Sequence, residues 1–166
     1  MPRRLVLAFL LAGAARLEGE APSKPLAQAT LDVWGPGQGL PQSTVQAIAQ
    51  TPDGYLWVGT QEGLARFDGA QFTVFDRRST TALTANAVLS LLVDPEGTLW
   101  VGTNGGGLLR MRGEHLEAIG PDQGLTGRKV QALARDGRGT IWVGTDDEGL
   151  FRLDGGSFRR VLAEEG

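Results

Sequence analysis

Few residues in this sequence have side chains that could carry out catalysis. The chain has one histidine, His115, and no cysteine, which excludes thiolate nucleophiles, thiolate metal sites and disulfide bonds. A hydrolytic triad needs a base that is oriented beside its nucleophile. His115 instead takes a turn-to-strand position, where two similar segments of the chain carry Gln71 and Ser157. We therefore predict that His115 is a surface turn residue and that the chain has no catalytic residue.

Carboxylates and glycines gather at two points that resemble ligand sites. The run Asp146-Asp147-Glu148 could attract a divalent cation through its oxygen atoms, but it lacks the alternating ligand spacing of a calcium loop. The glycines at 105–107 resemble a phosphate loop, but no helix follows them to cradle a phosphate. We interpret the acidic run as a solvated turn and the glycine run as a loose hairpin. The sequence thus predicts no metal site and no cofactor.

A repeat of 42 to 43 residues dominates the sequence. Three segments share the core Trp-Val-Gly-Thr, and their tryptophans, Trp57, Trp100 and Trp142, are 43 and 42 residues apart. A Gly-Leu pair follows each core, and an apolar residue, a charged residue and a glycine come next. Upstream valines keep the same spacing as the tryptophans: Val45, Val88 and Val130. Matches at so many fixed offsets indicate tandem copies of one structural unit.

Each copy holds four short apolar runs that are separated by turn residues, many of them Asp-Gly pairs. Such pairs supply the positive φ angles that tight hairpins require, and no run reaches helical length. Four strands in a period of this size are typical of a propeller blade. We predict an all-β fold: a partial β-propeller of three four-stranded blades at about 41–82, 83–124 and 125–166, in an incomplete ring. The three repeated tryptophans are expected to pack between blades.

The loops that lead into the innermost strands of a propeller converge at the mouth of its channel, where ligands bind. In this sequence these loops are residues 41–44, 83–86 and 125–129, and their polar side chains differ between blades. A binding surface would show such variation on a constant framework, and ordinary variation of exposed loops is the alternative. Charged donors in the third loop suit an anionic or uronic-type ligand. The candidate ligand-binding residues are Gln42, Thr44, Thr84, Asn86, Arg128 and Lys129.

The N-terminal segment has the features of a secretory signal. Arg3 and Arg4 precede an apolar run at residues 5–15, and small residues follow. The run is too short to span a bilayer comfortably, and an uncleaved anchor is the alternative. We predict a signal peptide at 1–21, a lead-in at 22–40 and a periplasmic location. The net charge of -3 provides no basic surface for nucleic acid.

Three blades are too few for a closed ring, because propellers close with roughly four to eight. The lead-in also contains a strand-like segment at residues 30–34, which we interpret as the outermost strand of an incomplete blade. Open ends would expose apolar blade faces and strand edges. We therefore expect either that the native gene product is longer or that the chain self-associates to close a ring.

The repeat core is similar to a known family. The segment from Asp53 to Leu64, Asp-Gly-Tyr-Leu-Trp-Val-Gly-Thr-Gln-Glu-Gly-Leu, resembles the two-component regulator propeller repeat. The lead-in Asp32-Val33-Trp34, followed by Gly39-Leu40-Pro41-Gln42, is similar to the opening of that family's sensor region. This resemblance extends over about residues 29–166. Members of the family are typically membrane-bound bacterial receptors, in which an exported sensor precedes a transmembrane helix and an output module, usually a histidine kinase or a diguanylate cyclase.

The resemblance implies a function in signalling. The chain would be part of the exported ligand-sensing input region of a two-component or cyclic-di-GMP receptor, acting by binding and not by catalysis. Its partners would be a small-molecule or oligosaccharide ligand, further C-terminal repeats and an output domain. A propeller scaffold for protein–protein interaction is the alternative. A propeller lyase, some of which use a histidine base, is a third interpretation.

Overall fold

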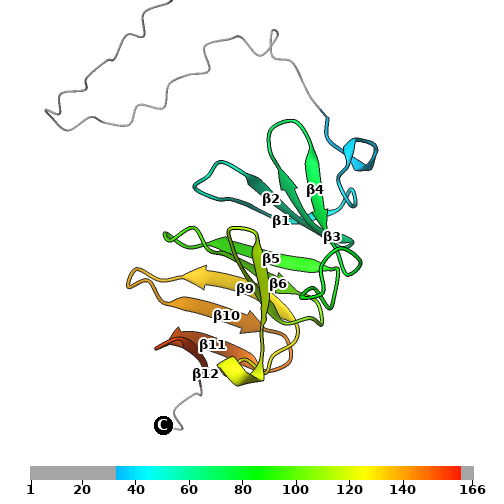
Figure 1. Cartoon of the computed structure of the whole chain (residues 1–166). Helices are drawn as coiled ribbons and strands as arrows, with labels where there is room; N and C mark the ends of the chain where they lie inside the picture. Colours follow the sequence, from blue (N-terminus) through cyan, green and yellow to red (C-terminus); the bar gives the residue numbers. More distant parts are fainter. Residues whose placement is uncertain (1–32, 162–166) are drawn as a thin grey trace, which may run out of the picture. The chain divides into compact units, whose positions relative to one another are not determined.

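The computed structural model describes residues 33–161, and these form three four-stranded antiparallel sheets (Figure 1). The predicted signal peptide and most of the lead-in lie outside the described residues. The strands of the first sheet are β1 (Val45–Gln50), β2 (Leu56–Thr60), β3 (Gly63–Phe67) and β4 (Phe72–Phe75). Those of the second are β5 (Val88–Val93), β6 (Leu99–Thr103), β7 (Leu108–Arg112) and β8 (His115–Ile119). Those of the third are β9 (Val130–Arg135), β10 (Ile141–Thr145), β11 (Gly149–Asp154) and β12 (Ser157–Arg160).

Each sheet is a meander whose strands pair in chain order. The repeat imposes the same register in every sheet, so that each tryptophan faces an arginine on the next strand: Trp57 opposite Arg66, Trp100 opposite Arg110 and Trp142 opposite Arg152. An irregularity in the pairing of the first two strands also recurs near the same end of each sheet. Each repeat is therefore one blade, and the predicted partial propeller is confirmed.

Neighbouring blades contact one another mainly through their inner strands: β5 contacts β1 of the first blade and β9 of the third. Apolar side chains fill the two junctions. Trp57 packs with Leu83, Val88 and Val101 between the first and second blades. Trp100 packs with Val143 and other residues between the second and third blades. The expected inter-blade packing is thus confirmed for these two tryptophans, whereas Trp142 belongs to neither core cluster.

Glycines in the second strand of each blade let the next blade approach closely. A Cβ placed on Gly59 would lie 2.5 Å from Val88 Cγ1, and one on Gly102 would lie 2.7 Å from Val130 Cγ1. These distances are far below an ordinary carbon–carbon contact. The valine that begins the inner strand of one blade therefore sits in a socket that a glycine leaves open in the preceding blade.

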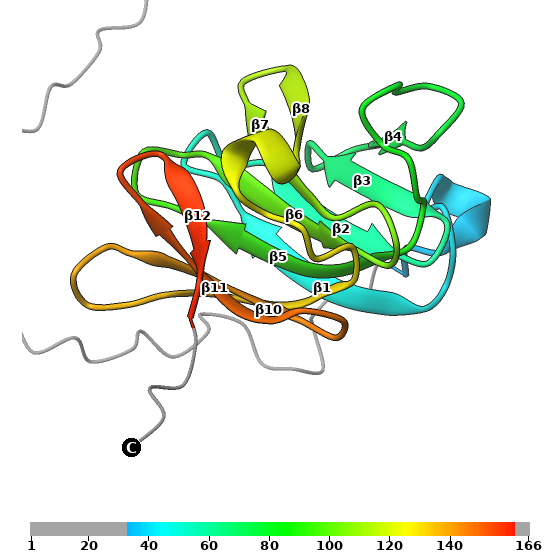
Figure 2. The ribbon, with the colours of Figure 1, turned by 90° about the horizontal axis from the view of Figure 1, so that it is seen from below.

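Short 3-10 helices lie ahead of two of the blades. Helix η2 (Pro36–Gln38) precedes the first blade, and η3 (Pro121–Gln123), in yellow in Figure 2, joins the second blade to the third. Gly124 follows η3 with φ +83°, and a Cβ there would lie 2.1 Å from the Phe158 carbonyl oxygen, so this turn requires glycine. None of the helices among residues 33–161 is long and apolar enough to span a membrane.

The strand that we expected at residues 30–34 lies mostly outside the described residues. Its described part, Val33 and Trp34, is not in a strand. Trp34 nevertheless packs on the first blade, with its ring centroid 4.6 Å from that of Phe67 and 5.9 Å from that of Phe72. The lead-in thus contributes side-chain packing to the first blade even without strand pairing in this part.

Candidate binding site at the channel mouth

The antiparallel order of each blade brings two kinds of loop to one end, which we call the mouth end. These are the connections between blades and the turns between the second and third strands of each blade. The opposite end, which we call the turn end, carries the turns between the first and second strands and between the third and fourth. All six candidate ligand-binding residues lie in the segments that lead into the inner strands at the mouth end.

The connection into the third blade is held by the hairpin turn of the second. The N–H groups of Gly105 and Gly107 donate to the Arg128 carbonyl oxygen at 3.0 and 2.8 Å, and Arg128 Nε donates to the Gly105 carbonyl oxygen at 3.3 Å. Gly107 has φ +76°, a conformation that favours glycine. The glycine run is therefore a hairpin turn, as the sequence predicts, and it fixes the position of the predicted site residue Arg128.

The acidic run at 146–148 is bound by basic and backbone groups of the same chain. Lys129 Nζ lies 2.5 Å from Asp146 Oδ2, the Arg128 N–H donates to Asp147 Oδ2 at 2.9 Å, and Arg160 Nη1 lies 3.0 Å from Glu148 Oε2. The hydrogen bond from Arg128 is the main reason that the pKa of Asp147 is lowered from its ordinary value. No cluster of potential metal ligands occurs within residues 33–161.

Two of the predicted residues meet in one cavity. A cavity of about 280 Å³ lies at the mouth end of the second blade, against the connection into the third blade. Thr84 and Arg128 line it from two different connections, and Gly106, Ile119 and Leu125 supply part of the remaining wall. Thr126 lines it as well, so the cavity combines two hydroxyls and one guanidinium with backbone and apolar surface, which is a composition typical of small-ligand sites.

The other predicted residues have separate surroundings. Asn86 Oδ1 accepts a hydrogen bond from the Arg77 N–H at 2.9 Å, so this side chain braces its own connection. Gln42 Oε1 is a buried side-chain oxygen with no hydrogen-bond partner among the described residues, and Thr44 is exposed. Lys129 is engaged by Asp146. The structure thus brings Thr84 and Arg128 together and does not place the other four in their cavity.

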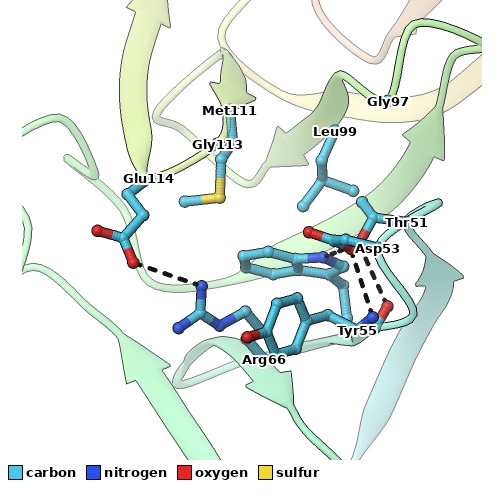
Figure 3. A pocket seen from close by; sticks show the side chains of 10 residues that line it. Thr51, Asp53, Tyr55, Arg66, Gly97, Leu99, Met111, Gly113 and Glu114 are labelled. Atoms are coloured by element: carbon cyan, nitrogen blue, oxygen red, sulfur yellow. Dashed lines mark hydrogen bonds and ion pairs between the residues drawn. The ribbon is translucent and has the colours of Figure 1, made fainter.

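Two further cavities lie at the turn end, one in each blade junction. The first, of about 160 Å³, lies between the first and second blades, where the Arg66 guanidinium stacks over the Tyr55 ring at 4.5 Å and reaches towards Glu114 (Figure 3). The second, of about 260 Å³, is lined by equivalent positions such as Trp100 and Arg110. Because equivalent repeat positions line both of these cavities, we attribute the two cavities to the way in which neighbouring blades pack.

The turn end contains hydrogen-bond acceptors whose role the sequence reading missed. Asp94 accepts from the Thr98 N–H at 2.8 Å and from Trp100 Nε1 at 3.0 Å, and Asp136 does the same for Thr140 and Trp142, both at 2.9 Å. The signal for these residues was available, because both aspartates stand six positions before a repeated tryptophan. The pKa of Asp136 is lowered, chiefly by the bond from Trp142.

The first blade replaces this aspartate by Thr51, whose Oγ1 accepts from Trp57 Nε1 at 3.0 Å. Asp53, which begins an Asp-Gly pair in the same turn, accepts from the Thr51 hydroxyl at 2.5 Å. A threonine and a carboxylate two residues apart thus share the task that one aspartate performs in the other blades.

The only histidine begins β8 and is exposed. His115 lies on the wall of an open depression together with Glu114, Ser79 and Thr80. Its position agrees with the predicted surface turn-to-strand residue.

The comparisons with known proteins agree with this architecture. The family described as two component regulator propeller matches residues 39–62, 82–105 and 124–147, one match for each blade. No curated protein sequence matches the chain.

Solved structures with similar folds include extracellular domains of bacterial signalling proteins. The extracellular domain of BT3049 from B. thetaiotaomicron, described as a hybrid two component system, is 27% identical with a TM-score of 0.71 over 78% of this chain. The extracellular domain of BT4673 from the same organism is 26% identical with a TM-score of 0.60 over 77% of the chain. This chain spans 20% and 18% of the lengths of those two chains.

A more distant fold relative is the virginiamycin B lyase from Staphylococcus aureus, which is 17% identical with a TM-score of 0.51. The match covers 72% of this chain and 42% of the lyase, and it reflects the propeller fold alone. The repeat in all three blades, the four-stranded meanders and the likeness to sensor domains lead to one assignment: the chain belongs to the two-component regulator propeller family.

Proposed function

We propose that this chain is part of an exported ligand-sensing input region of a bacterial two-component or cyclic-di-GMP signalling receptor. The observation that carries the proposal is the match of every blade to the two-component regulator propeller repeat, together with the likeness to two extracellular sensor domains. Those domains are extracellular, which supports a periplasmic or extracellular location for this chain. Further repeats and an output domain would be its partners in signalling.

We further propose that the chain acts by binding and not by catalysis, through the cavity that Thr84 and Arg128 share. Backbone hydrogen bonds to the hairpin of the second blade hold Arg128 in place, which lowers the entropic cost of binding. The Arg128 side chain donates to the Gly105 carbonyl oxygen through Nε. The terminal guanidinium nitrogens can therefore donate to a carboxylate as a charged fork. The ligand class that fits is an acidic small molecule or oligosaccharide.

A calorimetric titration with trigalacturonic acid as the acidic probe and maltotriose as the neutral probe tests this site. We expect heat of binding with the acidic probe alone. Arg128→Ala should weaken binding about tenfold, because it removes a charge-assisted hydrogen bond worth about 1.5 kcal/mol or more. Arg138→Ala is the matched control, since Arg138 is exposed in a turn-end loop of the same blade, and it should bind like the unmodified chain.

Two results would contradict the proposal. If neither probe releases heat, or if Arg128→Ala and Arg138→Ala bind equally well, the cavity is not the site. Mass spectrometry of the recovered probe separates binding from catalysis, because cleavage of the acidic probe would favour the lyase interpretation instead.

A further inference from the structure

Arg128 is held by two neighbouring blades at once. Its carbonyl oxygen accepts hydrogen bonds from the N–H groups of Gly105 and Gly107, in the hairpin turn of the second blade, at 3.0 and 2.8 Å. Its N–H donates to Asp147 Oδ2, in the hairpin turn of the third blade, at 2.9 Å. Its Nε donates to the Gly105 carbonyl oxygen at 3.3 Å. We call these contacts the Arg128 clamp.

The clamp is particular to this connection, although the blades repeat. Ser43 and Asn86 hold the equivalent positions in the sequence. Within residues 33–161, neither of them has backbone hydrogen bonds to a neighbouring hairpin turn. The turn of the second blade is also longer than that of the first: the Thr103 hydroxyl donates to a carbonyl oxygen four residues ahead, and the Thr60 hydroxyl to one three residues ahead. The longer turn reaches the connection into the third blade.

The same turn also packs against the opposite wall of the cavity. A Cβ on Gly106 would lie 3.0 Å from Thr84 Oγ1 and 3.1 Å from the Ala85 nitrogen, so only glycine fits there without movement of its neighbours. The backbone of residues 105–107 therefore sets how far Thr84 lies from Arg128. On the third-blade side, by contrast, the clamp depends on one side chain, that of Asp147.

The charge of Asp147 acts against an acidic ligand, whereas its hydrogen bond supports one. The bond from the Arg128 N–H is the main cause that lowers the pKa of Asp147 from its ordinary value, so the carboxylate is charged at neutral pH. Such a charge close to the cavity repels an acidic ligand. The hydrogen bond instead fixes the backbone that carries the guanidinium. Because the two effects have opposite signs, an experiment can separate them.

We propose that Asp147 is a positioning residue for Arg128 and that the third blade thereby completes the acidic-ligand site, a role that rests on the proposed function of the cavity. The clamp fixes Arg128 before the ligand arrives, which lowers the entropic cost of binding. Coupling between two contacts is reciprocal. A ligand held by Arg128 therefore stabilises the contact with Asp147 in return, and occupancy of the cavity is transmitted to the third blade.

Two neutral substitutions isolate the hydrogen bond. Asp147→Asn keeps an oxygen that accepts from the Arg128 N–H, and Asp147→Ala does not. Both remove the same charge, so any difference in affinity between them reports the clamp. In titrations with trigalacturonic acid, Asp147→Ala should bind about fivefold more weakly than Asp147→Asn. Asp147→Asn should bind at least as tightly as the unmodified chain, because the repulsion is gone.

Asp146 provides the matched control, since it precedes Asp147 in the same exposed turn. Its carboxylate pairs with the Lys129 side chain, which does not line the cavity. Asp146→Ala and Asp146→Asn should therefore bind the probe equally well. Equal affinities for the two Asp147 variants, with Arg128→Ala still weakened, would overturn this inference and leave the proposed function standing. No binding of the probe by the unmodified chain would overturn both.

Hydrogen exchange tests the clamp without a ligand. The Arg128 amide should exchange faster in Asp147→Ala than in Asp147→Asn, and circular dichroism should show that both variants are folded. In the unmodified chain, trigalacturonic acid should slow exchange at Arg128. It should not slow exchange at Gly139, whose N–H donates to the Asp136 carbonyl oxygen at 3.0 Å at the turn end of the same blade. Equal exchange of the Arg128 amide in the two Asp147 variants would overturn the inference.

Discussion

The connections between blades differ from one another in their contacts, whereas the turn that precedes each repeated tryptophan makes the same contact in every blade. At the turn end, every blade makes the same contact: an oxygen six residues before the tryptophan accepts a hydrogen bond from its indole nitrogen. At the mouth end, each connection makes contacts that the others lack, such as the bond of Asn86 to Arg77 in one and the pair of Lys129 with Asp146 in another. The hairpin turns at the mouth end still share one bond, because Thr60, Thr103 and Thr145 each donate to a glycine carbonyl oxygen there. The repeat therefore preserves contacts in the hairpin turns of both ends, and only the connections between blades vary.

This difference indicates which residues stabilise a blade and which are free to take part in binding. The indole contacts are local, within one turn of each blade, so the first hairpin of each blade is held by groups of that blade alone. The mouth contacts join segments of different repeats, as in the hydrogen bonds from Gly105 and Gly107 to Arg128. Side chains at the mouth can therefore change without disturbing the blade, and this freedom suits a surface that must recognise a ligand.

The largest effect is expected from Asp94→Ala at the turn end. Asp94 is buried and accepts hydrogen bonds from both the Thr98 N–H and Trp100 Nε1. Removing the carboxylate leaves two donors without partners, and the free energy of unfolding should fall by about 3 kcal/mol. Urea denaturation followed by tryptophan fluorescence measures the loss.

The matched control for this experiment is Asp122→Ala at the mouth end. Asp122 is exposed in the first turn of η3, and the substitution should change the free energy of unfolding by less than about 0.5 kcal/mol. Equal losses for the two aspartates would remove the distinction between the ends.

A smaller effect is expected from Thr51→Val in the first blade. Valine keeps the shape of threonine but cannot accept the hydrogen bond from Trp57 Nε1. Because one donor rather than two loses its partner, the free energy of unfolding should fall by about 1 kcal/mol. A loss as large as that of Asp94→Ala would mean that Thr51 and Asp53 act as one unit, and a Thr51→Val/Asp53→Ala double-mutant cycle would detect that coupling.

Much of the architecture could be predicted from the sequence, because the constraints on a blade are local and repeated. The spacing of Trp57, Trp100 and Trp142 indicated the blades, and the Asp-Gly turns indicated the strands between them. The burial of Trp57 and Trp100 followed from their place in the second strand. Trp142 holds the same position in its own second strand but is only half-buried. Its burial depends on contact with a neighbouring blade, which the sequence of its own blade does not determine.

The candidate site was less accessible to sequence reasoning. The sequence identified the loops at the mouth end. Which of their side chains are used in contacts within the chain, and which are free to bind a ligand, depends on contacts between repeats. Nothing in the local sequence shows that Asn86 Oδ1 is used by Arg77, or that Lys129 is held by Asp146. The indole acceptors Asp94 and Asp136 were missed for a different reason. They resemble ordinary turn formers, and only the fold shows that their second oxygen reaches a side chain.

The pH dependence of the third blade offers a third way to compare the ends. The pKa of Asp136 at the turn end and that of Asp147 at the mouth end are both lowered in the folded chain. A lowered pKa contributes stability that is present above the unfolded value, near 3.8, and that is lost as the pH falls through the folded value. Trp142→Phe removes the main cause at Asp136, so the pKa of Asp136 should rise towards its ordinary value.

Carboxyl-detected NMR titration measures both groups in the same sample. The pKa of Asp147 should stay unchanged in Trp142→Phe, because its main hydrogen bond comes from the Arg128 backbone. A parallel rise at Asp147 would show that the two ends of the blade are coupled.

The smallest effect is expected from Lys129→Met at the mouth end. The side chains of Lys129 and Asp146 are 36% and 55% exposed, and an ion pair so open to water contributes less than about 1 kcal/mol. Raising the salt concentration should shrink even this difference, since screening weakens exposed pairs. Thermal unfolding at low and high salt, with Lys129→Met/Asp146→Asn closing a double-mutant cycle, gives the measurement. A salt-independent loss comparable to that of Asp94→Ala would mean that the mouth, like the turn end, is built for stability, and the case for a binding surface there would weaken accordingly.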